Sequence, residues 1–156
     1  MKTQKFISKS SEETIKFGKQ LSKSLKRGDI VCLFGDLGSG KTTIIKGIAQ
    51  GLKIAHTKVN SPTFVFMNIY QGRLPLFHFD LYRLDDIDGI RSIGADEFLY
   101  GDGISVVEWA DRFGVLMPDE YLRVDLNHKN VDERVIQLSA KGSRYQNIVE
   151  KVKCAL

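Results

Sequence analysis

The chain has 156 residues, 42% of them hydrophobic, and carries 23 Lys and Arg against 19 Asp and Glu, a formal net charge of +4. This length and composition fit a single domain over residues 1–156 with a real core, and argue against a second domain. The small basic excess permits an anionic ligand but does not indicate a nucleic-acid surface. The first residues hold no apolar signal core and no run approaches a membrane span, so we expect a cytoplasmic protein with no membrane contact.

A first helix is predicted over residues 10–28. Ser10 and Glu13 form a capping-box pattern ahead of it. Apolar or small side chains then recur at helical spacing, at Thr14, Phe17, Leu21 and Leu25. Gly28 suits the end of this helix. The apolar run 29–34 follows and predicts a buried strand, because it is apolar on both faces as a central parallel strand is.

The segment after the glycine-rich turn, residues 41–52, has helical periodicity and predicts a second helix that ends at Gly51. Residues 63–70 and 74–82 then predict two strands joined by a turn at Gln71 and Gly72. Residues 85–100 indicate one or two short helices.

The last third of the chain predicts a further buried strand over 103–109 and a hairpin from 121–127 and 133–139. A final helix is expected from Ser143 onward. Strands thus alternate with helices around a buried strand that leads into a glycine-rich turn. This order favours a three-layer α/β fold of the P-loop NTPase type, with a mixed, mainly parallel central sheet.

The turn between the first buried strand and the second helix carries the strongest signal. Gly35-x-x-x-x-Gly40-Lys41-Thr42 matches the Walker A pattern in full. Its glycines let backbone N–H groups turn toward a phosphate, and the helix that follows adds a favourable field. Lys41 is expected to reach the β- and γ-phosphate oxygens, and the Thr42 hydroxyl to bind Mg²⁺.

A P-loop also requires a carboxylate for the magnesium shell, usually at the end of a buried strand. Asp80 ends the run LFHFD and Glu108 ends the run ISVVE. The residues alone leave open which of the two serves the metal. If both converge on the loop, one can orient the magnesium ion while the other positions the attacking water.

Three further residues have a plainer interpretation beside the functional one. Thr63, in the segment VNSPTF, could sense a γ-phosphate, but on its own Ser-Pro-Thr is a weak signal and favours a plain turn before a strand. Trp109 follows Glu108 and by itself favours a core position. His78 alternates with apolar residues and has no companions at ligand spacing, so we do not expect it to bind a metal.

The base-reading patterns of GTPases are not met. Asp86–Gly89 and Asp111–Gly114 match the loose Asp-x-x-Gly pattern, but neither directly ends an apolar strand. The segment nearest to Asn-Lys-x-Asp is Asn127–Asn130, NHKN, which fails it. ATP is therefore favoured over GTP.

Five motifs in this order resemble one family. They are GDLGSGKTT, VNSPTF, HFDLYR (His78–Arg83), GADEFL (Gly94–Leu99) and VVEW. Together they resemble the bacterial tRNA threonylcarbamoyladenosine biosynthesis ATPase family TsaE, also called YjeE. The resemblance implies an ATPase that uses ATP/ADP and Mg²⁺ and supports the partner proteins TsaD and TsaB. That complex transfers a threonylcarbamoyl group to an adenosine next to the tRNA anticodon, so tRNA would be involved indirectly.

The resemblance also implies roles for individual residues. Thr42 and Glu108 match the magnesium positions, Asp80 an acidic residue needed for hydrolysis, and Thr63 the switch threonine. Trp109 becomes an active-site or interface residue, and Ser10 and Arg134 are expected near the adenine. The remaining nucleotide contacts are expected from the phosphate loop: Asp36, Leu37, Gly38, Ser39, Gly40, Lys41, Thr42 and Thr43.

Two other functions use the same loop. A small-molecule kinase would transfer the phosphoryl group to a hydroxyl, and such enzymes usually close a basic lid over the γ-phosphate. Arg83 and Arg91 lie in a plausible place for one, but no arginine-rich lid stands out in the sequence. The second alternative is a binding module in which bound ATP orders VNSPTF without hydrolysis being the output.

Overall fold

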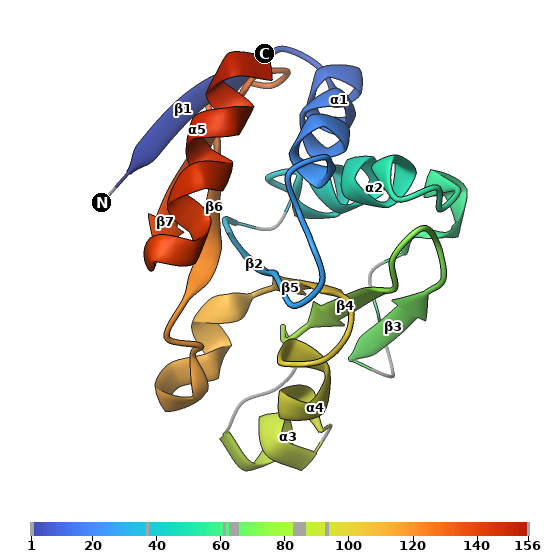
Figure 1. Ribbon diagram of the computed structural model, residues 1–156. Coiled ribbons are helices and arrows are strands. Elements are labelled where there is room, and N and C mark those ends of the chain that lie inside the picture. Colours follow the sequence, from blue (N-terminus) through green and yellow to red (C-terminus); the bar gives the residue numbers. More distant parts are fainter. Residues whose placement is uncertain are drawn as a thin grey trace.

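The computed structural model describes residues 2–36, 38–60, 62, 66–82, 87–92 and 94–155. Within them, one seven-stranded sheet lies between two helical layers (Figure 1), as the predicted three-layer α/β fold requires. The strands are β1 (Thr3–Ser8), β2 (Ile30–Phe34), β3 (Met67–Tyr70), β4 (Leu76–Asp80), β5 (Ile104–Glu108), β6 (Tyr121–His128) and β7 (Arg134–Lys141). The α-helices are α1 (Ser11–Ser22), α2 (Lys41–Gly51), α3 (Ile87–Ser92), α4 (Ala95–Leu99) and α5 (Gln146–Ala155). Short 3₁₀ turns are η1 (His56–Lys58), η2 (Ala110–Leu116) and η3 (Ser143–Tyr145).

The sheet is mixed, with the strand order β1-β7-β6-β2-β5-β4-β3. The central pairings β6–β2, β2–β5 and β5–β4 are parallel. The pairings toward the two edges, β1–β7, β7–β6 and β4–β3, are antiparallel. Parallel pairing thus occupies the middle of the sheet, where helices cover both faces, which is its usual setting.

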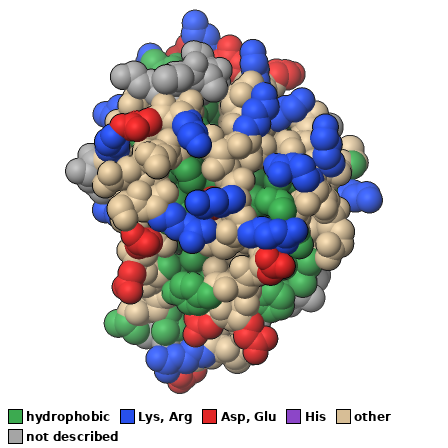
Figure 2. All heavy atoms as spheres, in the orientation of Figure 1, with side chains coloured by type: hydrophobic (Ala, Val, Ile, Leu, Met, Phe, Trp, Pro, Cys, Tyr) green, Lys and Arg blue, Asp and Glu red, His purple; other side chains and the backbone are tan. Residues whose placement is uncertain are grey.

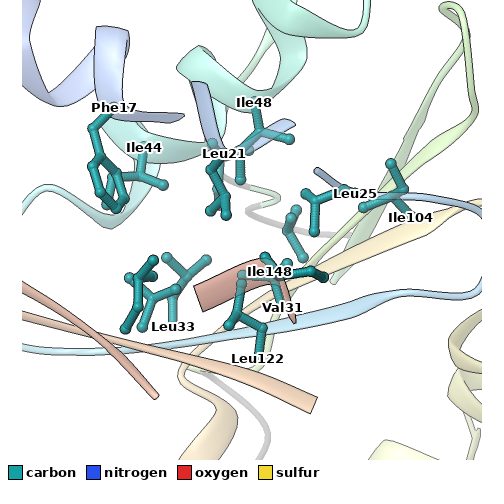
Figure 3. Packing of buried hydrophobic residues seen from close by; sticks show 14 of the residues in the cluster. Phe17, Leu21, Leu25, Val31, Leu33, Ile44, Ile48, Ile104, Leu122 and Ile148 are labelled. Carbon is teal, nitrogen blue, oxygen red and sulfur yellow. The ribbon is translucent and has the colours of Figure 1, made fainter. Parts of the chain in front are cut away.

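The larger core lies between the sheet and the layer of α1, α2 and α5. Figure 3 shows Phe17 and Leu21 of α1 beside Ile44 and Ile48 of α2, above the strands, and Leu25, which follows the end of α1, near Ile104 of β5. These are the apolar stripes that the helical spacing predicts. On the opposite face, a second core joins Cys32 and Phe79 to α3, α4 and η2. Burial raises the pKa of the Cys32 thiol, so this cysteine is a packing group rather than a reactive one.

Helix α1 is shorter than the sequence predicts. Its N-cap is Ser10, whose Oγ accepts the Glu13 N–H at 3.1 Å, as the capping box requires. The helix ends at Ser22 rather than continuing to Gly28. The carboxylate of Asp29 accepts the N–H of Lys26 at 2.8 Å, and this turn replaces the last predicted helical turn.

Strand β1 is the element that the sequence did not predict. It is an edge strand whose residues alternate between more and less exposed, so its sequence has no continuous apolar run. It pairs with β7, from Thr3 opposite Ser139 to Ser8 opposite Arg134. The two predicted hairpins are confirmed as β3–β4 and β6–β7. The first of these strands begins only at Met67; the start of its predicted range, residues 63–65, lies outside the described residues.

Figure 2 shows Lys and Arg side chains spread over the face that carries α1 and α5, with fewer Asp and Glu side chains among them. This agrees with the small positive charge of the chain. No helix in the described part of the chain has the length and apolar character needed to cross a membrane.

Candidate nucleotide-binding site

The sheet order brings the predicted site residues to one edge. Because β2, β5 and β4 are parallel neighbours, their carboxyl ends meet there, and ligands of open α/β sheets bind at this edge. The phosphate loop follows β2, Glu108 ends β5 and Asp80 ends β4. A cavity of about 320 Å³ opens between them. It is lined by Gly38, Gly40, Lys41, Thr42, Thr43, Asp80, Tyr82, Glu108 and Trp109.

The loop itself has the backbone of a phosphate cradle. Gly38 and Gly40 take φ values of 78° and 109°, in the left-handed region that favours glycine. Gly40 is the N-cap of α2, and no side-chain hydrogen bond caps this helix start. The first N–H groups of α2 therefore remain available to an anion. Ser39 Oγ is buried in the loop and has no hydrogen-bond partner among the described residues.

Lys41 is the buried cation of the site, with 6% of its surface exposed. Its Nζ donates to the carbonyl oxygens of Gly35 at 2.5 Å and Asp36 at 3.0 Å. The ammonium also lies 4.3 Å from the ring centroid of Trp109, at cation–π distance. Burial lowers the pKa of Lys41, and the negative charge of Glu108 opposes this shift. These contacts hold the ammonium beside the loop.

Thr42 and Glu108 are the second pair of interacting residues in the site. The Thr42 hydroxyl donates to Glu108 Oε1 at 3.0 Å, so an oxygen-bearing side chain from α2 and one from β5 meet beside Lys41. Glu108 is only 3% exposed. Among the described residues, no three His, Cys, Asp or Glu side chains gather to hold a metal ion. Thr42 and Glu108 thus fit a cation that takes its other ligands from phosphate and water, as Mg²⁺ does.

Asp80 stands directly opposite Glu108 in the β4–β5 register. Its Oδ1 accepts the N–H of Tyr82 at 3.0 Å. Burial raises the pKa of the Asp80 carboxyl, the Tyr82 N–H counteracts the shift, and the charge of Glu108 adds to it. The two acids therefore converge, as the sequence suggested they could, but they contact different groups.

Trp109 lies both against the core and at the candidate site, the two positions that the sequence analysis considered for it. It packs on the second core and also covers the cavity, with its ring against Lys41 and 4.8 Å from that of Tyr82. Its φ of 59° is left-handed and rare for a large residue. This conformation ends β5 at Glu108 and turns the indole over the loop.

A second cavity of about 530 Å³ continues from the phosphate loop along the start of α1. It shares Gly38, Gly40 and Thr43 with the first cavity and adds Ser10 and Arg134, the two residues expected near the adenine. The Arg134 guanidinium donates from Nε to the Ser39 carbonyl at 3.1 Å, which fixes it against the loop. A nucleoside attached to a phosphate in the loop would have space here.

The structure thus brings most of the predicted site residues together. Asp36 is exposed and contributes its carbonyl to Lys41. Leu37 and Thr63 lie outside the described residues. Sequence reasoning missed Tyr82, which lines the first cavity two positions after Asp80, and Lys9 and Asp132, which line the second. The spacing after Asp80 could have indicated Tyr82, whereas Asp132 reaches the site only through the β6–β7 hairpin.

The fold and the loop together define the class of protein. A three-layer α/β sheet with a Walker A turn between β2 and α2, and acids at the ends of β4 and β5, is a P-loop NTPase fold. A crystal structure of YdiB from Bacillus subtilis aligns over 99% of this chain and 96% of its own length, with a TM-score of 0.84 and 35% identity.

The family follows from the comparison of sequences. Residues 8–136 match the model of the family described as "Threonylcarbamoyl adenosine biosynthesis protein TsaE". The chain is 40% identical to the tRNA threonylcarbamoyladenosine biosynthesis protein TsaE of Bacillus subtilis over 97% of this chain and 95% of that protein. It is 38% identical to the TsaE protein of Treponema pallidum over 77% and 88% of the two chains. The chain therefore belongs to the TsaE family.

Proposed function

We propose that the chain is a Mg²⁺-dependent ATPase that acts in tRNA threonylcarbamoyladenosine biosynthesis. The contact of Thr42 Oγ1 with Glu108 Oε1 at 3.0 Å carries this proposal, because it joins two oxygen ligands next to the phosphate-loop lysine. The names of the relatives support the pathway. A cytoplasmic location belongs to the same proposal.

Each residue has a defined part in the proposed hydrolysis. The loop N–H groups and Lys41 bind the phosphate oxygens, and Lys41 exchanges its carbonyl partners for the γ-phosphate. Thr42 and Glu108 would hold Mg²⁺, which would supply positive charge to stabilise the negative charge of the phosphates. Asp80, which faces the same cavity, orients the attacking water. Catalysis is then mainly positioning and charge stabilisation.

The nucleoside half is proposed to lie in the second cavity, with the base near Ser10 and Arg134. ATP is favoured over GTP because the nearest base-reading segment, residues 127–130, lacks the required aspartate. Thr63 is proposed as the γ-phosphate sensor on the basis of the family motif alone.

TsaD and TsaB are the proposed partners, and tRNA is reached through their complex. We expect slow turnover by the isolated chain, because none of the described residues lining the first cavity is an arginine. An arginine finger supplied by a partner raises the rate of NTP hydrolysis by about 10³- to 10⁵-fold.

The test is ATP turnover by the wild type and Lys41→Ala, each alone and with TsaB and TsaD. We expect slow turnover by the wild type alone, faster turnover with both partners, and none above background for Lys41→Ala. Lys46→Ala, farther along the same helix, is the matched control and should behave as the wild type. Equal wild-type rates in all mixtures would contradict partner activation.

Of the two arginines considered for a kinase lid, Arg83 lies outside the described residues, and the position of Arg91 disfavours the kinase alternative. This residue lines a separate cavity with Ile90, Gly94 and Phe113, away from Lys41 and Glu108. A metabolite screen that finds a phosphorylated product would nevertheless replace the ATPase proposal.

The binding-module alternative is tested by two variants. If Asp80→Ala and Glu108→Ala abolish hydrolysis but still restore tRNA modification in cells, nucleotide binding alone is the function.

A further inference from the structure

His78, in the middle of β4, lies directly behind the proposed magnesium carboxylate. Its side chain is fully buried, with 0% exposure. Its Nε2 lies 2.6 Å from Glu108 Oε2, while the other carboxylate oxygen, Oε1, accepts the Thr42 hydroxyl. One carboxylate thus joins the imidazole on one side to the phosphate-loop helix on the other.

The sheet register explains this contact. Glu108 is paired with Asp80, so His78, two residues earlier on β4, is its diagonal neighbour on the same face of the sheet. Leu76 and Val106, which share this face, belong to the core beneath α1 and α2. The imidazole and the carboxylate are therefore directed toward the helix that carries Thr42.

The chemistry of the two groups fixes the direction of the hydrogen bond. An ionised carboxylate only accepts, so Nε2 of His78 carries the proton and donates it to Glu108. The other ring nitrogen, Nδ1, is buried and has no partner among the described residues. A proton on Nδ1 would leave a buried N–H without an acceptor, whereas the Nε2–H tautomer leaves only an unused lone pair.

We propose that His78 is a positioning residue for Glu108: it fixes one carboxylate oxygen so that the other is aimed at Thr42 and the Mg²⁺ position. This inference rests on the proposed function, in which Glu108 serves the metal. Partners of this kind orient metal-binding side chains in many proteins, and their loss typically lowers metal affinity or activity about 10- to 100-fold. A buried histidine that only fills the core would have no such effect.

Three substitutions separate positioning from packing. In His78→Gln the amide nitrogen can take the place of Nε2 and still donate to Glu108. In His78→Asn the amide nitrogen takes the place of Nδ1, and the asparagine side chain is too short for this nitrogen to reach Glu108. His78→Phe keeps a ring in the core but has no donor. Thermal unfolding without ligand measures what each change costs in packing.

The first readout is Mg²⁺ dependence. For His78→Asn and His78→Phe we expect the Mg²⁺ concentration that half-saturates ADP binding and ATP hydrolysis to rise about 10-fold or more. ADP affinity without Mg²⁺, measured by calorimetry, and KM for ATP at saturating Mg²⁺ should stay near wild-type values. His78→Gln should restore most of the Mg²⁺ affinity. Equal Mg²⁺ dependence of the Phe, Gln and wild-type proteins would overturn the proposal.

The second readout needs neither nucleotide nor activity. A long-range ¹H–¹⁵N NMR spectrum of the apo wild type should show His78 as the Nε2–H tautomer, assigned by the loss of its signals in His78→Gln. In Glu108→Ala this single tautomer should give way to a mixture. An Nδ1–H tautomer in the wild type would refute the contact, even if a variant fails to fold.

The outcomes also separate this inference from the proposed function. A wild type that neither binds nor hydrolyses ATP contradicts the proposed ATPase, while the NMR spectrum still decides whether His78 holds Glu108. An active wild type whose His78→Phe variant has normal Mg²⁺ dependence leaves the ATPase in place and refutes the role of His78.

Discussion

Glu108 and Asp80 are equivalent in sequence but not in their contacts. Each ends an apolar strand, and the sequence could predict both as acids of the site because the ends of parallel strands meet at one edge. It could not assign their roles from spacing. The structure separates them: Glu108 contacts Thr42 and His78, whereas Asp80 accepts the backbone N–H of Tyr82 and faces the cavity.

This separation gives a prediction for two charge-removing substitutions. Glu108→Gln keeps the shape of the side chain but removes its charge, so we expect Mg²⁺ to lose most of its effect on ATP binding. Asp80→Asn should leave Mg²⁺-dependent ATP binding near the wild-type value, while hydrolysis falls about 10²- to 10⁴-fold, as loss of a catalytic acid or base does. Calorimetry with and without Mg²⁺ and single-turnover hydrolysis measure the two effects. The assignment is reversed if Asp80→Asn is the variant that loses Mg²⁺ dependence.

At the scale of elements, α1 and α2 pack in unusually close contact. A methyl group added at Gly18 of α1 would overlap the Ile44 carbonyl oxygen and lie 3.1 Å from the Cα of Gly47 in α2. The helical spacing of Phe17 and Leu21 predicted which face of α1 is buried. It did not predict how near the backbones approach, because that distance depends on which helix lies opposite.

We therefore expect Gly18→Ala to destabilise the protein, although alanine is the better helix former by about 1 kcal/mol. Forcing the two helices apart should lower the free energy of unfolding by about 1 to 3 kcal/mol. Chemical denaturation measures the change. Lys19→Ala, at the neighbouring exposed position, should be nearly neutral. An unchanged or higher stability of Gly18→Ala would show that α1 can shift without loss.

At the scale of the whole molecule, Tyr145 ties the carboxyl-terminal segment to the start of the central strand. Its side chain is 1% exposed, and its hydroxyl oxygen accepts the N–H of Ile30 at 2.9 Å. The single-domain organisation expected from the chain length stays a prediction. Such long-range ties lead us to expect one cooperative unfolding transition.

Tyr145 gives this stability a pH dependence. Burial raises its pKa from an ordinary value of 10.0 to about 12. The folded state thus holds the phenolic proton of Tyr145 more tightly than the unfolded state does. The contribution of this group to the free energy of unfolding is therefore complete below pH 10 and is lost as the pH rises toward 12. Tyr145→Phe should lower the free energy of unfolding by about 1 to 3 kcal/mol near neutral pH, since the Ile30 N–H loses its acceptor. The difference from the wild type should shrink above pH 10, and a difference that grows would contradict the assignment.

The sequence by itself determined the local parts of this protein. The Walker A turn lies between an apolar run and a helical run, and β2 and α2 form as predicted, because adjacent residues dictate strand, glycine turn and helix. The hairpins and the carboxyl-terminal helix follow from the same short-range patterns.

Only the tertiary structure decided which distant residues meet. The strand order places His78 diagonal to Glu108, Trp109 over Lys41, and Arg134 against the loop at Ser39. It also pairs β1 with β7, at the opposite end of the chain. Hydrophobic period and turn residues specify each element but not its neighbours in the sheet. The residues surrounding the phosphate loop therefore depend on long-range pairings that no local pattern contains.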